Sequence, residues 1–410
     1  MISHAHNRVA VTGLGIITAI GESLSEFEEG IFKGQCGIAP ISLFDTDGFI
    51  CQSAGQVKTS DLGQGFTARE LKRLSRCDIL GLIAARQALS DANIPLEMLD
   101  KSRIGVVLGG ATGGMLAWEK YRQALWRGQS GCYPSLLLPF SNCTLTDLIA
   151  GTYHFAGLRS TISTACSSSA TSIGYGYDLI RSGTQDVVLT GGSEALSQLT
   201  FAGFNSIRAL DPKTCRPFDK NRQGMSLGEG AAILVLENFD QAVSRGAHIY
   251  AQVQGYAINA DAYHMTSPDP QGMGMSKVMV GALQKAAVSA DQIDYINAHG
   301  TATVINDQLE AMAIRRVFEK ARVGDLAVSS TKSMVGHCLG AAGGIEAVAT
   351  ILALYRQQVP PTANFTDLDP ACDLDCVPNT ARHQPVRFAV SNSFAFGGNN
   401  TSLVFGRVGE

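Results

Sequence analysis

The sequence predicts an α/β protein built from two similar halves, and three observations support this. Short apolar runs alternate with longer Ala- and Leu-rich segments along the 410 residues, as strands alternate with helices. Glycine is abundant, at 44 residues, and proline is sparse, at 13, which suits many tight turns. Residues 84–94 and 283–293 resemble one another, and each precedes a polar link and a strand. Strands that alternate with helices favour parallel sheets covered on both faces.

The expected elements follow in order along the chain. The first strand is expected over residues 8–12 and is ended by Gly13. Further strands are expected at residues 104–108, 186–190, 231–236, 295–298 and 388–391. Helices are expected over residues 68–92, directly after Cys166 and over residues 341–355. Glycine turns are expected at residues 109–114, 191–194 and 397–398. The segment 245–247 separates an N-terminal half, residues 1–246, from a C-terminal half, residues 247–410.

The bulk composition narrows the class of protein. Hydrophobic residues make up 45% of the chain and charged residues 17%, as in a globular protein with a large core. A net charge of −4 gives no reason to expect nucleic acid or an anionic membrane as a partner. We expect no signal peptide and no membrane span, and we expect the protein to be cytoplasmic.

The ten cysteines are scattered along the chain. They form no Cys-x-x-Cys pair, and Cys372 and Cys376 have no histidine cluster nearby. This spacing argues against a zinc site and against a disulfide framework, so we expect reduced thiols.

Gly13 and Gly15 invite comparison with a dinucleotide-binding loop. Thr18 stands where the third glycine of that loop belongs, and no acidic residue follows a second strand at the required distance. The sequence therefore argues against a dinucleotide site.

Cys166 is the most informative residue. It lies in the small-residue segment 163–170, which leads into Ile173, Tyr177 and Ile180. That spacing predicts a helix, so the sulfur lies at or just before a helix N-terminus. Unpaired backbone N–H groups there favour an anion, and a thiol so placed ionises more readily. The alternative is a buried structural cysteine in a serine-rich turn.

Three later segments share this small-residue character, and each follows an expected strand. They are residues 297–303 with His299, residues 329–344 with Lys332 and His337, and residues 391–400 with Phe396. Taken singly, His299 fits a structural role, Lys332 a solvated side chain, and the glycines after Phe396 a simple turn. Ser329-x-x-Lys332 matches a serine-acylase motif, but the other two elements of that motif do not occur.

Together the four segments resemble the β-ketoacyl synthases. The motifs are Gly157-x4-Ile162-x2-Ala165-Cys166-Ser-Ser-Ser-x3-Ile173, His-Gly-Thr-x-Thr at 299–303, Lys-x4-His at 332–337 before Leu-Gly-Ala-Ala-Gly, and Asn-Ser-Phe-x-Phe-Gly-Gly at 392–398. The resemblance spans the whole chain and is greatest to the elongating, KAS II-type enzymes. It implies the thiolase-like αβαβα fold, five layers from two duplicated halves. It also implies a β-ketoacyl-acyl carrier protein synthase, which condenses a Cys-bound acyl chain with malonyl carrier protein and releases CO2.

The resemblance also implies roles for individual residues. Cys166 is the nucleophile that accepts an acyl chain from an acyl carrier protein. His299 and His337 bind the malonyl thioester carbonyl, and Lys332 orients its surroundings through a hydrogen bond. The backbone N–H groups of Cys166 and Phe396 form the oxyanion hole, and Phe396 is also a gate. The chemistry needs no metal and no organic cofactor.

The resemblance also implies residues that contact the substrate, and the sequence departs from the family pattern at some positions. The substrate and its pantetheine arm are expected to contact Thr301, Thr303, Phe394 and Thr112. Thr112 stands where elongating synthases often carry a bulky apolar residue at the floor of the acyl pocket. Asn399 stands where the family usually has Thr. With the Ala165-Cys166-Ser-Ser-Ser context, these differences favour a specialised polyketide or polyene synthase, such as an aryl-polyene ketosynthase, over a housekeeping KAS II enzyme.

Related classes are separated by the same motifs. Thiolases carry a second catalytic Cys where this chain has the Phe-Gly-Gly loop, and KAS III-type enzymes use Cys-His-Asn, whereas His337 supports Cys-His-His. Chain-length-factor subunits lack the nucleophile that this chain keeps. The alternative to an enzyme is a non-catalytic subunit with the same fold. Retention of all four expected catalytic residues, Cys166, His299, Lys332 and His337, argues against it.

Basic residues lie close together on the expected helix 68–92. They are Arg69, Lys72, Arg73 and Arg76, and Arg208 is a further candidate together with Lys213 and Arg216. A solvated basic face is one interpretation, and a docking site for an acidic carrier protein is the other. Family members are dimers, so we expect a homodimer or a heterodimer with a chain-length-factor-like subunit.

Overall fold

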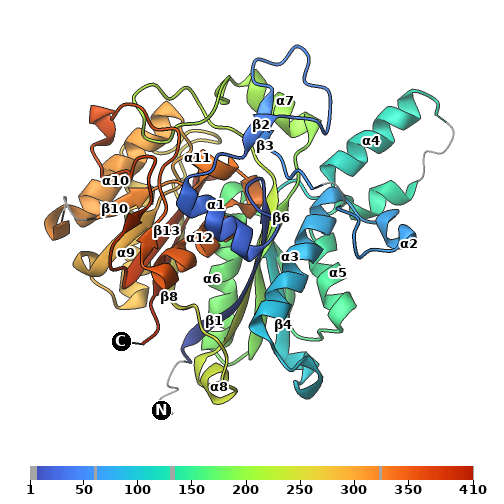
Figure 1. Cartoon of the computed structure of the whole chain (residues 1–410), viewed down its shortest axis with the longest axis horizontal. Coiled ribbons are helices and arrows are strands. Elements are labelled where there is room, and N and C mark those ends of the chain that lie inside the picture. The colour runs from blue at the N-terminus through green and yellow to red at the C-terminus, as the bar shows by residue number, and fades with distance from the viewer. Residues whose placement is uncertain (1–6, 60–61, 130–133, 323–325, 410) are drawn as a thin grey trace.

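Ten strands form one mixed sheet in two halves. The computed structural model describes residues 7–59, 62–129, 134–322 and 326–409. The strand order is β10-β9-β13-β14-β8-β1-β7-β6-β4-β5, so the strands of each half of the chain lie together. The halves meet where residues 9–11 of β1 pair with residues 251–253 of β8, near the centre of Figure 1.

The bounds of the elements are as follows. The first half contains β1 (Val9–Thr18), β4 (Ile104–Gly109), β5 (Arg159–Ile162), β6 (Val187–Glu194) and β7 (Gly230–Asn238). The second contains β8 (Ala251–Ala260), β9 (Ile293–Asn297), β10 (Ala327–Ser329), β13 (Phe388–Ala395) and β14 (Asn399–Gly406). The principal helices are α1 (Leu24–Lys33), α3 (Arg76–Ala92), α4 (Met115–Trp126), α5 (Thr144–Tyr153), α6 (Ser168–Arg181), α7 (Gln198–Ser206), α9 (Met273–Ala286), α10 (Val304–Arg322) and α12 (Ala342–Arg356). Shorter helices are α2 (Ala68–Leu71), α8 (Phe239–Ser244) and α11 (Lys332–Val335).

The strand order repeats between the halves. From the outer edge inwards it is β5-β4-β6-β7-β1 in the first half and β10-β9-β13-β14-β8 in the second. In each half the three outer strands are parallel and the next two are antiparallel. The predicted duplication is confirmed. The expectation of parallel sheets holds only for the three outer strands of each half, because an apolar run does not encode the direction of its strand. The boundary at residue 246 stays a prediction.

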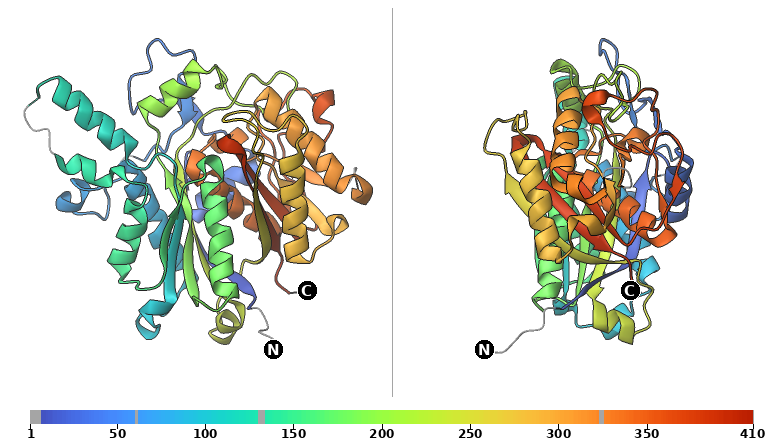
Figure 2. Two further views of the ribbon diagram at one scale, coloured as in Figure 1. Left: turned by 180° about the vertical axis from the view of Figure 1, so that it is seen from behind. Right: turned by 90° about the vertical axis from the view of Figure 1, so that its left-hand side faces the viewer.

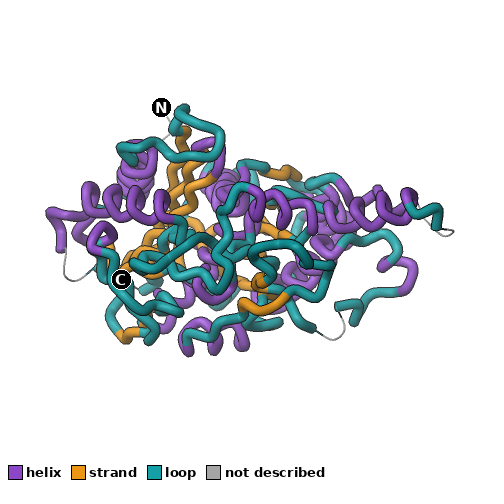
Figure 3. Tube along the Cα trace, turned by 90° about the horizontal axis from the view of Figure 1, so that it is seen from above, coloured by secondary structure: helices purple, strands orange, loops and turns teal. Residues whose placement is uncertain are grey.

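The helices complete five layers. Helices α6 and α12 contact each other in the middle layer, and α12 packs on β13 in one half and on β7 in the other. Helices α3 and α5 cover the outer face of the first half, and α9 with α10 covers that of the second (Figures 1 and 2). Seen from above, the strands lie between helices (Figure 3). The arrangement confirms the αβαβα fold.

Helix α12 is the apolar centre of this arrangement. In the described part of the chain, residues Leu339–Arg356 are the one helical segment long and apolar enough to cross a membrane. Because 89% of that segment is buried inside the protein, it is a core helix.

Three predicted elements differ from the structure. The segment 68–92 is two helices, because Ser75 caps α3 by accepting a hydrogen bond from the Asp78 N–H and so starts a new helix. Gly191 and Gly192 lie within β6 rather than in a turn. Strand β1 runs past Gly13 to Thr18.

Gly13 and Gly15 allow helix α3 to lie directly on β1. A Cβ at Gly13 would lie 2.3 Å from the carbonyl oxygen of Ala88, and one at Gly15 would lie 1.9 Å from that of Ala84. Both glycines therefore serve close packing, in agreement with the rejection of a dinucleotide loop.

We predict that Gly15→Ala lowers the free energy of unfolding by about 1–3 kcal/mol, because helix α3 must move to admit the methyl group. Gly151→Ala is the matched control, since a Cβ there meets nothing within 4 Å. We expect the control to change stability by less than about 1 kcal/mol. Urea unfolding at one protein concentration measures both, and equal effects of the two variants would contradict the packing role.

Candidate active site

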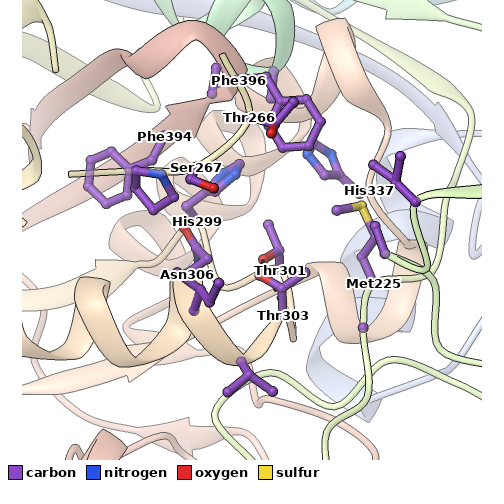
Figure 4. A pocket seen from close by; sticks show the side chains of 18 of the residues that line it. Met225, Thr266, Ser267, His299, Thr301, Thr303, Asn306, His337, Phe394 and Phe396 are labelled. Carbon is purple, nitrogen blue, oxygen red and sulfur yellow. Dashed lines mark hydrogen bonds between the residues drawn. The ribbon is translucent and has the colours of Figure 1, made fainter. Parts of the chain in front are cut away.

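A cavity of about 440 Å³ brings together side chains from both halves of the chain. Several of the residues predicted for the site line it, namely Cys166, Arg208, His299, Thr301, Thr303, His337, Phe394 and Phe396. Figure 4 shows the two histidines, the threonines and both phenylalanines around this space. Their convergence follows from the fold, because β9 and β13 are parallel neighbours whose carboxyl ends open toward the turn before α6.

Cys166 lies in the 3-10 turn Ala165–Ser167, directly before α6. The sulfur therefore lies next to a helix N-terminus, as predicted. Ala165 has φ 54°, in the left-handed region that residues other than glycine rarely adopt. Such backbone strain persists only where the surrounding structure holds it, and it is frequent at active sites.

The groups around the Cys166 thiol have opposing effects on its pKa. Burial raises its pKa to about 11, whereas the Lys332 ammonium and a hydrogen bond from the backbone N–H of Phe396 act to lower it. The resting thiol is therefore protonated at neutral pH, and the expectation that it ionises more readily than a free thiol is wrong, because burial outweighs the charges and donors around it. The Phe396 N–H is placed to stabilise negative charge that develops at this position.

His299 and His337 face each other in the cavity wall, with ring centroids 5.3 Å apart and planes at 84°. Lys332 Nζ lies 3.1 Å from Nδ1 of His299, and because an ammonium only donates, this nitrogen accepts. The backbone N–H of Leu339 donates to Nδ1 of His337 at 3.2 Å. Each ring therefore carries its proton on Nε2.

Both imidazoles are uncharged. Burial lowers the pKa of His299 well below its usual value, the positive charge of Lys332 adds to this, and a positive charge on His337 would act in the same direction. Burial followed by the Lys332 charge does the same to the pKa of His337. The cavity wall thus offers two neutral Nε2–H donors beside one thiol.

Lys332 is buried behind the cavity rather than in its lining. Its ammonium forms an ion pair with the carboxylate of Glu346 and donates to the carbonyl oxygen of His299 at 2.5 Å. Burial raises the pKa of Glu346 to about 7, and Lys332 acts to lower it. The sequence reasoning missed Glu346. The sequence does contain a sign of its importance, because Glu346 is the single charged residue in the apolar run 342–354.

The loop 299–303 is held by two buried acids at the start of α10, which were also missed. Glu310 accepts from the backbone N–H groups of His299 at 2.8 Å and of Gly300 at 2.7 Å. Asp307 accepts from the N–H of Ala302 at 3.2 Å. These bonds fix the backbone that presents His299 and the two threonines.

Thr112 is placed differently from the other predicted residues. It is absent from the lining of this cavity, and its hydroxyl donates to the buried carboxylate of Glu194. Glu194 also accepts from the N–H groups of Ala111 at 2.9 Å and Gly340 at 3.0 Å. A role for Thr112 at the floor of an acyl pocket stays a prediction.

The basic cluster divides into two parts. Arg69, Lys72 and Arg73 are exposed. Arg76 is wrongly grouped with them, because the break before α3 turns its side chain inward, where its Nη2 lies 2.6 Å from Glu229 and its side chain is 16% exposed.

Neither a disulfide nor a metal-binding group of side chains is present among the described residues. The nine cysteines in the described ranges are free thiols, and Cys132 lies outside those ranges. Among the residues that the structure describes, no three His, Cys, Asp or Glu side chains are grouped to hold a metal ion.

We predict that His337→Asn reduces the acid sensitivity of folding. A histidine held neutral when folded gains a proton on unfolding, so its share of stability is lost as pH falls below about 6.5. Below that pH the stability of the variant should fall less steeply than that of the unchanged protein, by up to about 1.4 kcal/mol per pH unit. Denaturant unfolding at pH 5 to 8 measures the slopes, with exposed His383→Asn as control. Parallel curves for His337→Asn and the unchanged protein would refute the neutral imidazole.

Comparisons with known proteins agree with this geometry. The N-terminal domain of beta-ketoacyl synthases matches residues 6–242 and the C-terminal domain matches residues 250–366. The 3-oxoacyl-[acyl-carrier-protein] synthase 2 of Synechocystis sp. is 41% identical over 406 residues, 97% of each chain.

Two solved structures are similar over nearly the whole chain. The ishigamide ketosynthase/chain length factor has a TM-score of 0.94 and 38% identity, over 99% of this chain and 100% of that chain. AntDE:AntF, a type II PKS acyl-carrier protein in complex with its ketosynthase, has a TM-score of 0.89 and 32% identity, over 98% and 100%. The chain belongs to the β-ketoacyl synthase family and is a condensing acyltransferase.

Proposed function

We propose that Cys166 carries the acyl chain that this condensing enzyme extends with a malonyl unit from an acyl carrier protein. One observation carries the proposal. The Cys166 thiol shares a single cavity with the Phe396 N–H and with two neutral imidazoles whose tautomers are fixed by Lys332 and the Leu339 N–H.

Acylation is the first step. The Cys166 sulfur forms a bond to the thioester carbon of the acyl carrier, the bond from that carbon to the pantetheine sulfur breaks, and the thiol proton ends on the departing sulfur. The N–H groups of Cys166 and Phe396 stabilise the oxyanion. Thr301 and Thr303, whose hydroxyls lie 2.9 Å apart in the cavity wall, contact the pantetheine arm.

Condensation is the second step. The bond between the malonyl carboxylate and its α-carbon breaks, CO2 leaves, and negative charge moves to the thioester oxygen. Hydrogen bonds from His299 and His337 stabilise this enolate, each by about 3 kcal/mol in the transition state. The carbon then attacks the carbonyl carbon of the Cys166 thioester, and the bond from that carbon to the sulfur breaks. The β-ketoacyl carrier is released, and the Cys166 thiolate that leaves takes a proton from solvent to restore the thiol.

We predict that Cys166→Ala abolishes acylation and lowers condensation by at least roughly a thousandfold. Intact mass spectrometry after incubation with an acyl carrier protein detects the adduct. Cys143→Ala, which removes an exposed thiol, is the control and should acylate normally. An acyl adduct that persists on the Cys166→Ala protein would refute the assignment.

The pathway is proposed to be of the polyketide or polyene type, with housekeeping fatty-acid elongation as the alternative. Similarity to two solved ketosynthase structures of TM-score 0.89 or more supports the first, and similarity to the 3-oxoacyl-[acyl-carrier-protein] synthase 2 of Synechocystis sp. supports the second. The proposed cellular location is the cytoplasm.

A panel of carrier-bound acyl chains distinguishes the pathways. We expect polyenoyl or β-ketoacyl chains to acylate Cys166 at least as fast as saturated chains of equal length, as a specialised enzyme requires. Burst kinetics monitored by mass measure this rate. Strong and exclusive use of saturated fatty acyl chains would assign the protein to fatty-acid elongation.

The acyl carrier protein is proposed to dock on Arg69, Lys72 and Arg73, with Arg208 at the mouth of the cavity. All four side chains are exposed, and Arg208 also lines the cavity. Opposite charges steer an acidic carrier toward such a surface.

We predict that Arg73→Glu raises the KM for malonyl carrier protein several-fold with little change in kcat, and that added salt narrows the difference. Arg387→Glu is the matched control, because Arg387 is exposed near the start of β13, the end remote from the cavity. If both variants bind the carrier equally, the patch does not dock it.

The partner chain is proposed to be a second copy or a chain-length-factor-like subunit. Helix α4 stands away from the body in Figure 1 and exposes Trp126, and the adjoining 3-10 segment exposes Leu138 and Phe140. Strand β5 is the edge strand of the first half of the main sheet, and such edges pair readily. Co-purification that identifies the bound chain separates a homodimer from a heterodimer.

A further inference from the structure

Asn399 begins β14, directly after the turn that carries Phe396. It pairs with Ala395 of β13 on one side and with Ala260 of β8 on the other, so its backbone is anchored on both sides. From that anchored position its side-chain Nδ2 donates to the carbonyl oxygen of Phe396 at 3.2 Å. The side chain therefore reaches back across the three-residue turn Phe396–Gly398.

The peptide unit between Phe396 and Gly397 is held at both ends. Its carbonyl accepts from Asn399, and its N–H donates to the carbonyl oxygen of Met265 at 2.7 Å. The turn depends on such restraints, because Gly397 and Gly398 have φ 78° and 71° and glycine restricts its own backbone least. One residue earlier, the backbone N–H of Phe396 hydrogen-bonds to the Cys166 thiol. Both residues line the same cavity, and the turns that carry them are in contact.

We propose that Asn399 is a positioning residue that holds the 396–397 peptide so that the Phe396 N–H stays aimed at the reacting group on Cys166. The inference rests on the proposed function of Cys166. Asn399 touches neither substrate nor sulfur in this account, and it acts through the backbone of Phe396. Its effect therefore belongs to the bond-making steps rather than to carrier binding.

The test compares Asn399→Leu and Asn399→Asp with the unchanged enzyme. Both replacements are close in size to Asn, and neither can donate to the Phe396 carbonyl. Loss of one such hydrogen bond should lower kcat by about three- to tenfold, with the KM for malonyl carrier protein unchanged within twofold. Asn7→Leu is the matched control, because Asn7 Nδ2 donates to the carbonyl oxygen of Ile180, also at 3.2 Å, and Ile180 lies at the opposite end of α6 from Cys166.

The readouts are steady-state kinetics, thermal unfolding and the mass of the Cys166 adduct. The inference is supported if kcat falls in both Asn399 variants while the kinetics of the Asn7→Leu control stay unchanged. The melting temperatures of the Asn399 variants must also be no lower than that of Asn7→Leu. An adduct on the unchanged enzyme with kcat retained in both variants, or a rise in KM alone, overturns it. Absence of an adduct on the unchanged enzyme overturns the proposed function as well.

Discussion

The buried ion pair between Lys332 and Glu346 is the interaction on which the site depends. An unpaired ammonium in that position would cost roughly 3–5 kcal/mol, and Glu346 on the core helix α12 supplies the opposite charge beside it. The same ammonium contacts Nδ1 and the carbonyl oxygen of His299. The core of the fold thereby sets which nitrogen of His299 carries a proton.

The fold is duplicated, but the chemistry is not. The turn with Cys166 before α6 has its counterpart in the turn with Gly340 before α12, and both turns begin with a residue of positive φ, Ala165 at 54° and Leu339 at 43°. One half presents a thiol at this place. The other half has glycine there, so it presents no side chain, and the Gly340 N–H donates to the carboxylate of Glu194 instead. The second half contributes the imidazoles and the ammonium, so the site exists only where the two halves meet.

Much of this arrangement could be predicted from the sequence because the information is local. The helix after Cys166 and the polar segments with His299, His337 and Phe396 follow short strands directly, and parallel strands bring their carboxyl ends together. What could not be predicted depends on packing between distant segments. Arg76 turns inward to Glu229, 153 residues away.

Other misses have the same cause. The hydroxyl of Thr112 donates to Glu194, which ends β6, the strand next to the one that leads into the loop with Thr112. The role of Glu346 depends on α12 placing its carboxylate beside Lys332. In both cases the residue is visible in the sequence, and its partner is known only from the fold.

The central claim is that burial and the Lys332 charge keep both imidazoles neutral, and that Lys332 and the Leu339 N–H fix their protons on Nε2. Nitrogen-15 NMR of histidine-labelled protein at pH 7 measures this directly, with His299→Asn and His337→Asn used to assign the two rings. The account predicts neutral rings in both positions, each protonated at Nε2 and unprotonated at Nδ1. A proton on Nδ1 of either ring, or an imidazolium signal from either at that pH, would contradict it.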